Sequence, residues 1–235
     1  MAEATGSAAD GLVGLMNVFV DPEATARKVP SPLSWLWPVV ILLVGYMVVA
    51  YLTLPYTQQF IDWSIKQGSV PAEQAEQARN VGRTIGQVVA YVMPILFIAF
   101  LLLFALLIKV VYSMMDIRPK FRDVFAMLAA CSIIPLLQAV ATYVVLRVKG
   151  DPVENQEQLQ PPFGLDIFMQ GIHGGALAFV HFFSIFEIWF LVVLVFGLAS
   201  LTKSTKMQAL IAITPVWILP LAMAVLGAIF QRKPA

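Results

Sequence analysis

Three polar side chains at three-residue spacing interrupt an apolar stretch in the second half of the chain. They are His181, Ser184 and Glu187, and they lie within the apolar run 178–198. In a helix, with about 100° between successive residues, these side chains fall within about 120° of one another and form one stripe. An ionisable group inside an apolar span is a functional candidate by default. The stripe therefore suggests a path for protons or ions.

A second polar stripe lies in the apolar run 124–146. Its members, at spacings of four, three and four residues, are Cys131, Pro135, Gln138 and Thr142. The two runs cross in opposite directions, so their depths can be compared at about 1.5 Å per residue. Gln138 then lies within about 3 Å of the depth of Glu187, and Thr142 and His181 both lie about 9 Å further toward one side. The two stripes are expected to face each other.

Two hypotheses account for this arrangement. In the functional one, Glu187 and His181 belong to a proton or ion path. In the structural one, which we favour, a protonated Glu187 hydrogen-bonds to Gln138 and holds two helices together. A transporter usually has more than five spans, internal repeats and broken helices, and the sequence has no convincing repeat. His181 and Ser184 also resemble the pair of an intramembrane protease, but both lie on one helix among phenylalanines, which disfavours that hypothesis.

Five apolar runs must position these side chains. They are residues 34–54, 88–111, 124–146, 178–198 and 207–230. Each reaches the roughly 20 residues that a helix needs to cross a hydrocarbon core of about 30 Å. Hydrophobic residues make up 60% of the chain and charged residues 12%, against about 25% charged in soluble domains. We predict an all-α polytopic membrane helical bundle of five transmembrane helices. Residues 1–33 would form an N-terminal cytoplasmic amphipathic segment, 34–230 the membrane domain and 231–235 a short tail.

Composition and motifs argue against several classes of protein. A formal net charge of +1 argues against a nucleic-acid surface, which needs a basic stripe. The sequence has no phosphate loop, no HExxH and no Gly-x-Ser-x-Gly elbow, and its single cysteine, Cys131, cannot form an intrachain disulfide. We interpret Cys131 as a packing residue. The expectation is a protein without catalytic residues, cofactor or metal.

Basic residues in the short loops predict the orientation. The loops around residues 115–123 and 202–206 lie on the same side as the N-terminus, and both carry lysines or arginines. The longer loops on the opposite side contain acidic as well as basic residues, so they have less net positive charge. Because short loops rich in lysine and arginine stay in the cytoplasm, we expect the N-terminus inside and the C-terminus outside.

The segment ahead of the first span has helical periodicity. Its apolar stripe consists of Leu12, Leu15, Met16 and Phe19. Asp21 and Pro22 then predict a second helix start, with the aspartate as cap and the proline at the first helical position. The stripe is a candidate contact for a partner; the alternative, which we favour, is a helix that lies on the headgroups or covers the bundle.

Two loops on the other side have structure of their own. Residues 71–79 are rich in alanine, glutamate and glutamine, which predicts a helix that extends the second span beyond the lipid. Residues 163–172 are apolar but too short to span. They predict an interfacial helix or a re-entrant piece.

The fourth run and the residues after it resemble the bacterial branch of the Yip1 family. Phe186, Ile188 and Trp189 match an aromatic-x-Ile-Trp core, and Gly197, Leu198 and Ala199 match the Gly-Leu-Ala that follows. The Asp21-Pro22 helix and the number of spans fit the same family. Glu187 departs from the pattern, in which a small polar residue is expected. The Asp-Leu-x-Gly-Pro motif of eukaryotic members is absent, so Rab GTPase binding is not implied.

The resemblance implies a non-enzymatic integral membrane protein. Eukaryotic Yip1-like proteins act in vesicle trafficking and membrane shaping, and some bacterial ones accompany ABC-type exporters. We therefore expect a scaffold or accessory subunit in the bacterial inner membrane. Its partners would be membrane lipids and another membrane protein or further copies of itself, with no nucleic acid. The alternative is a small proton- or ion-coupled transporter or channel that uses the Glu187 stripe.

Overall fold

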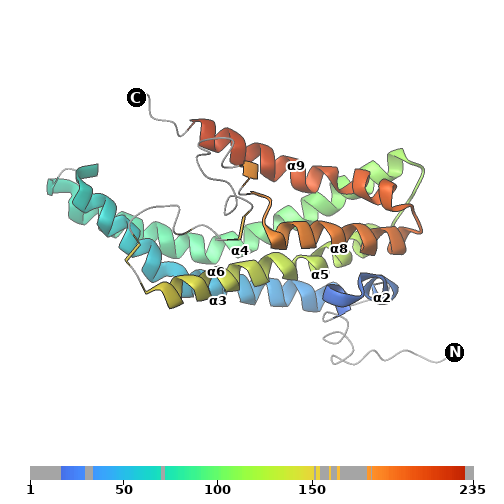
Figure 1. Cartoon of the computed structure of the whole chain (residues 1–235), viewed down its shortest axis with the longest axis horizontal. Helices are drawn as coiled ribbons and strands as arrows, with labels where there is room; N and C mark the ends of the chain where they lie inside the picture. Colours follow the sequence, from blue (N-terminus) through green and yellow to red (C-terminus); the bar gives the residue numbers. More distant parts are fainter. Residues whose placement is uncertain are drawn as a thin grey trace. The chain divides into compact units, whose positions relative to one another are not determined.

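The computed structural model describes residues 17–29, 34–69, 72–150, 152–153, 159, 163–164, 179–180 and 182–230. Within these residues the regular structure is helical, apart from one isolated bridge between Gly164 and Ser184. Five helical spans are long and apolar enough to cross a membrane, and Figure 1 shows how the helices follow one another along the chain. The predicted all-α fold with five membrane-spanning helices is confirmed.

The helices differ in length more than the apolar runs do. In chain order they are α2 (Pro22–Lys28), α3 (Leu36–Ser64), α4 (Ala75–Met114), α5 (Phe121–Cys131), α6 (Ile133–Lys149), α8 (Ile185–Thr202) and α9 (Lys206–Phe230). A π-helical turn, Ile65–Ser69, and a 3-10 turn, Ala72–Gln74, lie between α3 and α4. The third candidate span, Phe121–Lys149, is made by α5 and α6 together.

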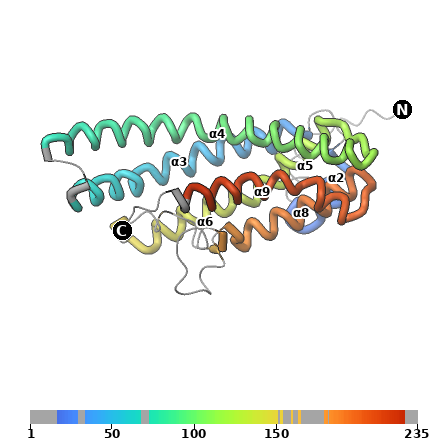
Figure 2. Tube along the Cα trace, turned by 90° about the horizontal axis from the view of Figure 1, so that it is seen from above, coloured from blue at the N-terminus to red at the C-terminus, as the bar shows by residue number. Residues whose placement is uncertain are grey.

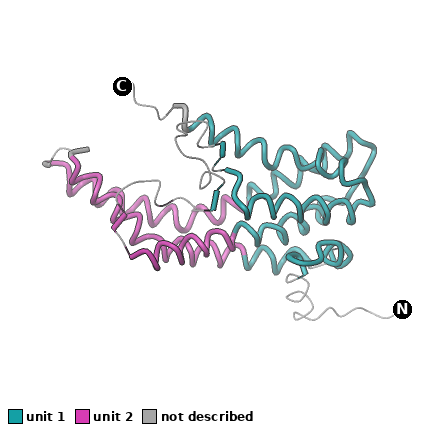
Figure 3. Tube along the Cα trace, in the orientation of Figure 1, with its two compact units in different colours: residues 1–41, 99–135, 163–235 teal, residues 42–98, 136–162 magenta. Residues whose placement is uncertain are grey.

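The chain divides into two compact units, which are coloured separately in Figure 3. Unit 1 comprises residues 1–41, 99–135 and 163–235, and unit 2 comprises residues 42–98 and 136–162. Unit 1 therefore contains α2, α5, α8, α9 and the last turns of α4. Unit 2 contains most of α3, the first part of α4 and nearly all of α6.

Helix α8 is the centre of unit 1. It packs against α2, α5 and α9, as the two views in Figures 1 and 2 show. Its side chains Leu194 and Leu198 are fully buried. Gly197 lies directly against the side chain of Met127 on α5, where an added Cβ would collide with it. The absence of a side chain at this position is what lets the two helices approach each other.

The third span is broken at Ser132. Pro135 has no N–H to donate to the carbonyl of Cys131, so the helical hydrogen-bond ladder is interrupted there. At the break, both the N–H and the hydroxyl of Ser132 donate to the carbonyl of Leu128, at 3.0 and 2.8 Å. The residues from Val124 to Cys131 are all buried. The span is consequently two helices, the first of which lies wholly inside unit 1.

Unit 2 contains a helical hairpin made by α3 and α4. The Arg79 guanidinium lies 2.8 Å from the carboxylate of Asp62 near the turn. Further along the hairpin, the rings of Tyr46 and Phe97 lie 4.7 Å apart. The predicted helical extension of the second span is confirmed, since α4 begins at Ala75.

The first span was predicted to end at residue 54, but the helix that contains it is longer. Helix α3 continues through Pro55 to Ser64. A proline inside a helix removes one hydrogen bond without necessarily ending the helix. Contacts with α4, such as that between Ile61 and Gly82, hold the additional turns in place.

Candidate functional site

Glu187 lies in the first turn of α8. The helix begins at Ile185, and Ser184 is its N-cap in an extended conformation, with φ −77° and ψ 161°. The Ser184 hydroxyl accepts a hydrogen bond from the Glu187 N–H at 3.0 Å, which satisfies one of the backbone donors that a helix start leaves free. The predicted span 178–198, with Glu187 near its middle, is therefore wrong at its beginning. The fourth candidate span is Ile185–Thr202.

The predicted stripe on α8 does not form as one helical face. Ser184 caps the helix and is not part of it, and His181 lies outside the described residues. Glu187 belongs to unit 1, whereas Gln138 and Thr142 lie on the part of α6 that belongs to unit 2. The opposition of the two stripes stays a prediction. Within α6, the Thr142 hydroxyl donates to the backbone carbonyl of Gln138 at 2.9 Å.

The start of α8 is fixed by a segment that precedes it in the sequence. The carbonyl of Phe163 accepts a hydrogen bond from the Ile185 N–H at 3.1 Å. The rings of Phe163 and Phe186 pack edge to face with centroids 5.3 Å apart. Glu187 is half-buried beside them. Among the residues that the structure describes, its carboxylate has no hydrogen-bond or ion-pair partner. A negative charge in the first turn is favourable because it faces the positive end of the helix dipole.

The other aromatic and small residues of the sequence signature each hold a different element. Trp189 packs against Phe19, with ring centroids 5.5 Å apart, and so fixes the N-terminal segment to α8. Gly197 receives the side chain of Met127 from α5. Ile188 is 41% exposed and holds nothing comparable. The signature is therefore mainly a set of packing contacts around α8.

The described part of the N-terminal segment packs against α8 within unit 1 through α2. Asp21 caps α2 through a 2.8 Å hydrogen bond from the Ala24 N–H, and Pro22 is the first helical residue, so the predicted helix start is confirmed. Val18 and Val29 are buried. Of the predicted stripe only Phe19 is described; Leu12, Leu15 and Met16 lie outside the described residues.

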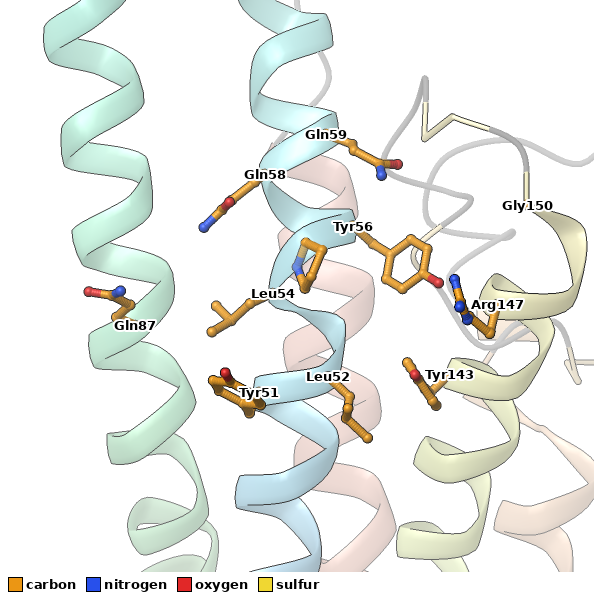
Figure 4. Close-up of a pocket in the computed structure, with 11 residues that line it drawn as sticks. Tyr51, Leu52, Leu54, Tyr56, Gln58, Gln59, Gln87, Tyr143, Arg147 and Gly150 are labelled. Carbon is orange, nitrogen blue, oxygen red and sulfur yellow. The ribbon is translucent and has the colours of Figure 1, made fainter.

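A cavity in unit 2 was not predicted from the sequence. It has a volume of about 570 Å³ and opens over α3 between α4 and α6 (Figure 4). Its lining combines tyrosines, glutamines, an arginine and aliphatic groups: Tyr51, Leu52, Leu54, Pro55, Tyr56, Gln58, Gln59, Gln87, Tyr143, Arg147 and Gly150. One feature of the sequence could have indicated this cavity. Tyr143 and Arg147 form an i, i+4 pair at the end of an apolar run, and Tyr56 lies near Tyr143.

Metal-binding geometry is absent from the described part of the chain, where no three His, Cys, Asp or Glu side chains gather around one point. The cavity in unit 2 offers neither a carboxylate nor a histidine in its lining.

Comparison with known proteins gives one match, to a family model that covers most of the chain. No curated protein and no solved structure matches the chain. The Yip1 domain matches residues 16–228, a range that includes all five candidate spans. The chain belongs to the Yip1 family.

Proposed function

We propose that this protein is a non-enzymatic scaffold or accessory subunit that binds another membrane complex. The partner would be an ABC-type exporter or a trafficking assembly. The proposed location is the inner membrane of a bacterium, with the N-terminus in the cytoplasm. The observation that carries the proposal is the hairpin of α3 and α4 in unit 2, because these helices are longer than a membrane requires.

Helix α4 is much longer than a helix that only crosses a membrane. Its 40 residues extend about 60 Å at about 1.5 Å per residue, twice the hydrocarbon thickness of about 30 Å. The first turns carry exposed polar side chains, among them Glu76, Arg79 and Arg83. Because α3 also continues to Ser64, the two helices form a paired extension beyond the apolar runs. A rigid extension of this kind supports contact with a partner outside the lipid.

The role of the family signature supports the same proposal. Phe186, Trp189 and Gly197 hold the helices of unit 1 together. None of them lines the large cavity. A sequence signature devoted to packing is what a structural membrane protein needs, whereas an enzyme needs its signature at reacting groups.

Site-specific photo-crosslinking tests the proposal. A crosslinking residue at Gln77 or Asn80, both exposed on α4, should give one defined protein adduct in membranes. The same substitution at Met223 of α9, which is 69% exposed, should give none and serves as the control. The crosslinked protein should also co-purify in stoichiometric amount in mild detergent. Purification of a lone chain or homo-oligomer, with no adduct from the hairpin, would contradict the proposal.

A second candidate function rests on Glu187. Its half-buried carboxylate, without a hydrogen-bond partner among the described residues, is consistent with a small proton- or ion-coupled transporter that also uses His181. The test is flux into proteoliposomes that contain the purified protein. Any flux should be abolished by Glu187→Gln, which keeps the size of the side chain and removes its charge. A flux that Glu187→Gln leaves undiminished would exclude this candidate.

A further inference from the structure

The large cavity in unit 2 lies where three helices change from apolar to polar. Helix α3 becomes polar after Pro55, α4 is polar up to Gln87, and α6 becomes polar at Arg147. All three of these residues line the same cavity. Tyrosine is enriched at this level in membrane proteins because its ring is apolar and its hydroxyl is polar, and three tyrosines line the cavity. The cavity therefore marks the level at which unit 2 leaves the hydrocarbon.

Hydrogen-bond donors gather on the α6 side of the cavity. Tyr143 and Arg147 are one helical turn apart and share a face of α6. Figure 4 shows Tyr56 pointing from α3 toward Arg147. The rings of Tyr56 and Tyr143 lie edge to face with centroids 6.4 Å apart. One guanidinium and two phenol hydroxyls thus surround a single region of the cavity.

The arginine has no counter-charge in the part of the chain that the structure describes. Arg147 forms neither an ion pair nor a hydrogen bond there, although Arg79 and Arg122 both lie against aspartates. A guanidinium presents several N–H groups in a planar fork that matches phosphate geometry. An exposed arginine between two phenols is consequently suited to a phosphate oxygen as its acceptor.

An apolar side chain lies next to these donors. Leu52 lies on α3 one turn before Tyr56, and its side chain is 37% exposed. Figure 4 shows it on the side of α3 that faces Tyr143. The cavity volume of about 570 Å³ falls within the range of about 300–1,000 Å³ that is typical of ligand sites. Its ligand should therefore have an anionic head and an apolar tail.

We propose that the groove between α3 and α6 binds an anionic phospholipid. The phosphate accepts hydrogen bonds from Arg147, Tyr56 and Tyr143, and the upper part of an acyl chain lies along Leu52. The level of the cavity in the membrane, and the apolar side chain of Leu52 next to the donors of Arg147 and Tyr143, favour a lipid over a free anion. Basic pockets between membrane helices are known to hold lipid headgroups. This site does not depend on the proposed partner or on the contacts of the hairpin.

The test measures lipid binding to the full chain purified in detergent. Phosphatidylglycerol is added, and its retention is followed by native mass spectrometry. Loss of a charge-assisted hydrogen-bonding group should weaken binding about tenfold in Arg147→Gln. Tyr143→Phe should weaken it less. Lys149→Gln is the matched control, since Lys149 is exposed on the same helix but does not line the cavity; it should retain the lipid like the unmodified chain.

Three results would overturn the proposal. One is equal lipid retention by Arg147→Gln and the unmodified chain. Another is an equal loss in Lys149→Gln, which would mean that binding follows net charge and not the cavity. The third is displacement of phosphatidylglycerol by inorganic phosphate at an equal concentration, because this would identify a free-phosphate site with no role for the acyl chain. Arg147→Lys, which keeps the charge but loses the fork, should bind more weakly than arginine and more strongly than glutamine.

Discussion

Helices α5 and α8 of unit 1 and the helices of unit 2 have similar apolar composition but different surroundings. The residues of α5 from Val124 to Cys131 are all buried, whereas the most apolar window of the first span, formed mainly by α3, is only 11% buried. In unit 1 a glycine receives a methionine side chain. In unit 2 polar side chains surround an open cavity. Hydropathy alone therefore does not distinguish a helix that builds the protein from one that presents a surface.

This difference has a functional meaning. The residues on which the sequence resemblance rests lie on α8, where Trp189 and Gly197 serve packing in unit 1. The surfaces proposed for a partner and for a lipid both lie in unit 2. Substitutions in unit 1 should therefore reduce stability, whereas substitutions on the surface of unit 2 should change binding with little loss of stability.

The largest effect is expected at the contact between α5 and α8. Gly197→Val places a branched side chain against Met127, which is fully buried. Overpacking of this kind should reduce the free energy of unfolding by about 1–3 kcal/mol. Gly227→Val is the control, because nothing lies within 4 Å of a Cβ added at Gly227. Thermal unfolding in detergent is the measurement, and equal melting temperatures for the two variants would contradict the contrast.

A smaller effect is expected where the N-terminal segment meets α8. Phe19→Ala removes the ring contact with Trp189 and should cost about 1–2 kcal/mol. The loss is local, so trypsin should cleave faster at Arg27 and Lys28 while the remaining helices stay folded. Val20→Ala changes a neighbouring side chain that is 88% exposed and should leave the cleavage rate unchanged. If both variants resist trypsin equally, Phe19 does not hold the segment.

The cap of α8 provides a third test within unit 1. Ser184→Ala removes the acceptor of the Glu187 N–H and should reduce the free energy of unfolding by about 1 kcal/mol. Ser184→Thr keeps an acceptor oxygen and should retain most of the stability. Unfolding of the two variants and the unmodified chain in the same detergent is the comparison. A loss of equal size in both variants would show that the size of the side chain matters and the cap does not.

The smallest effect is expected at the hairpin of unit 2. Asp62 and Arg79 form an ion pair with both side chains about half exposed. A pair of this kind contributes about 0.2–1 kcal/mol and is screened by salt. A double-mutant cycle with Asp62→Asn and Arg79→Gln should give a coupling energy in this range at low salt and almost none at about 1 M salt. A coupling energy that persists at high salt would contradict this prediction, because it would mean that solvent does not screen the pair.

Much of the fold follows from sequence patterns. Five spans were predicted because uninterrupted apolar runs have few alternatives in lipid. The extension of the second span, α4, was predicted from alanine, glutamate and glutamine at residues 71–79, and the start of α2 from Asp21 and Pro22. All of these predictions depended on local sequence: the spans on hydrophobicity, the α4 extension on helix propensity, and the start of α2 on capping.

Predictions that depended on the end of a helix were less successful. Residues 178–184 are apolar enough to continue the fourth span, yet Ser184 is the N-cap of α8 in an extended conformation. The hydrogen bond from the Ile185 N–H to the Phe163 carbonyl connects residues far apart in sequence. The first apolar run ends at residue 54, but α3 continues past Pro55 to Ser64, and beyond it Ile61 contacts Gly82 on α4. The cavity at Arg147 was missed for the same reason, because its lining comes from three separate helices.

The burial of α5 has a consequence for measuring the motions of unit 1. The chain has a single cysteine, and Cys131 is fully buried. A thiol reagent can reach it only when α5 is transiently exposed, so the rate of alkylation under native conditions reports the free energy of that local opening. The unmodified protein thus carries a probe at one position in its core. Labelling can follow unit 1 in a native membrane, where calorimetry and optical unfolding are difficult.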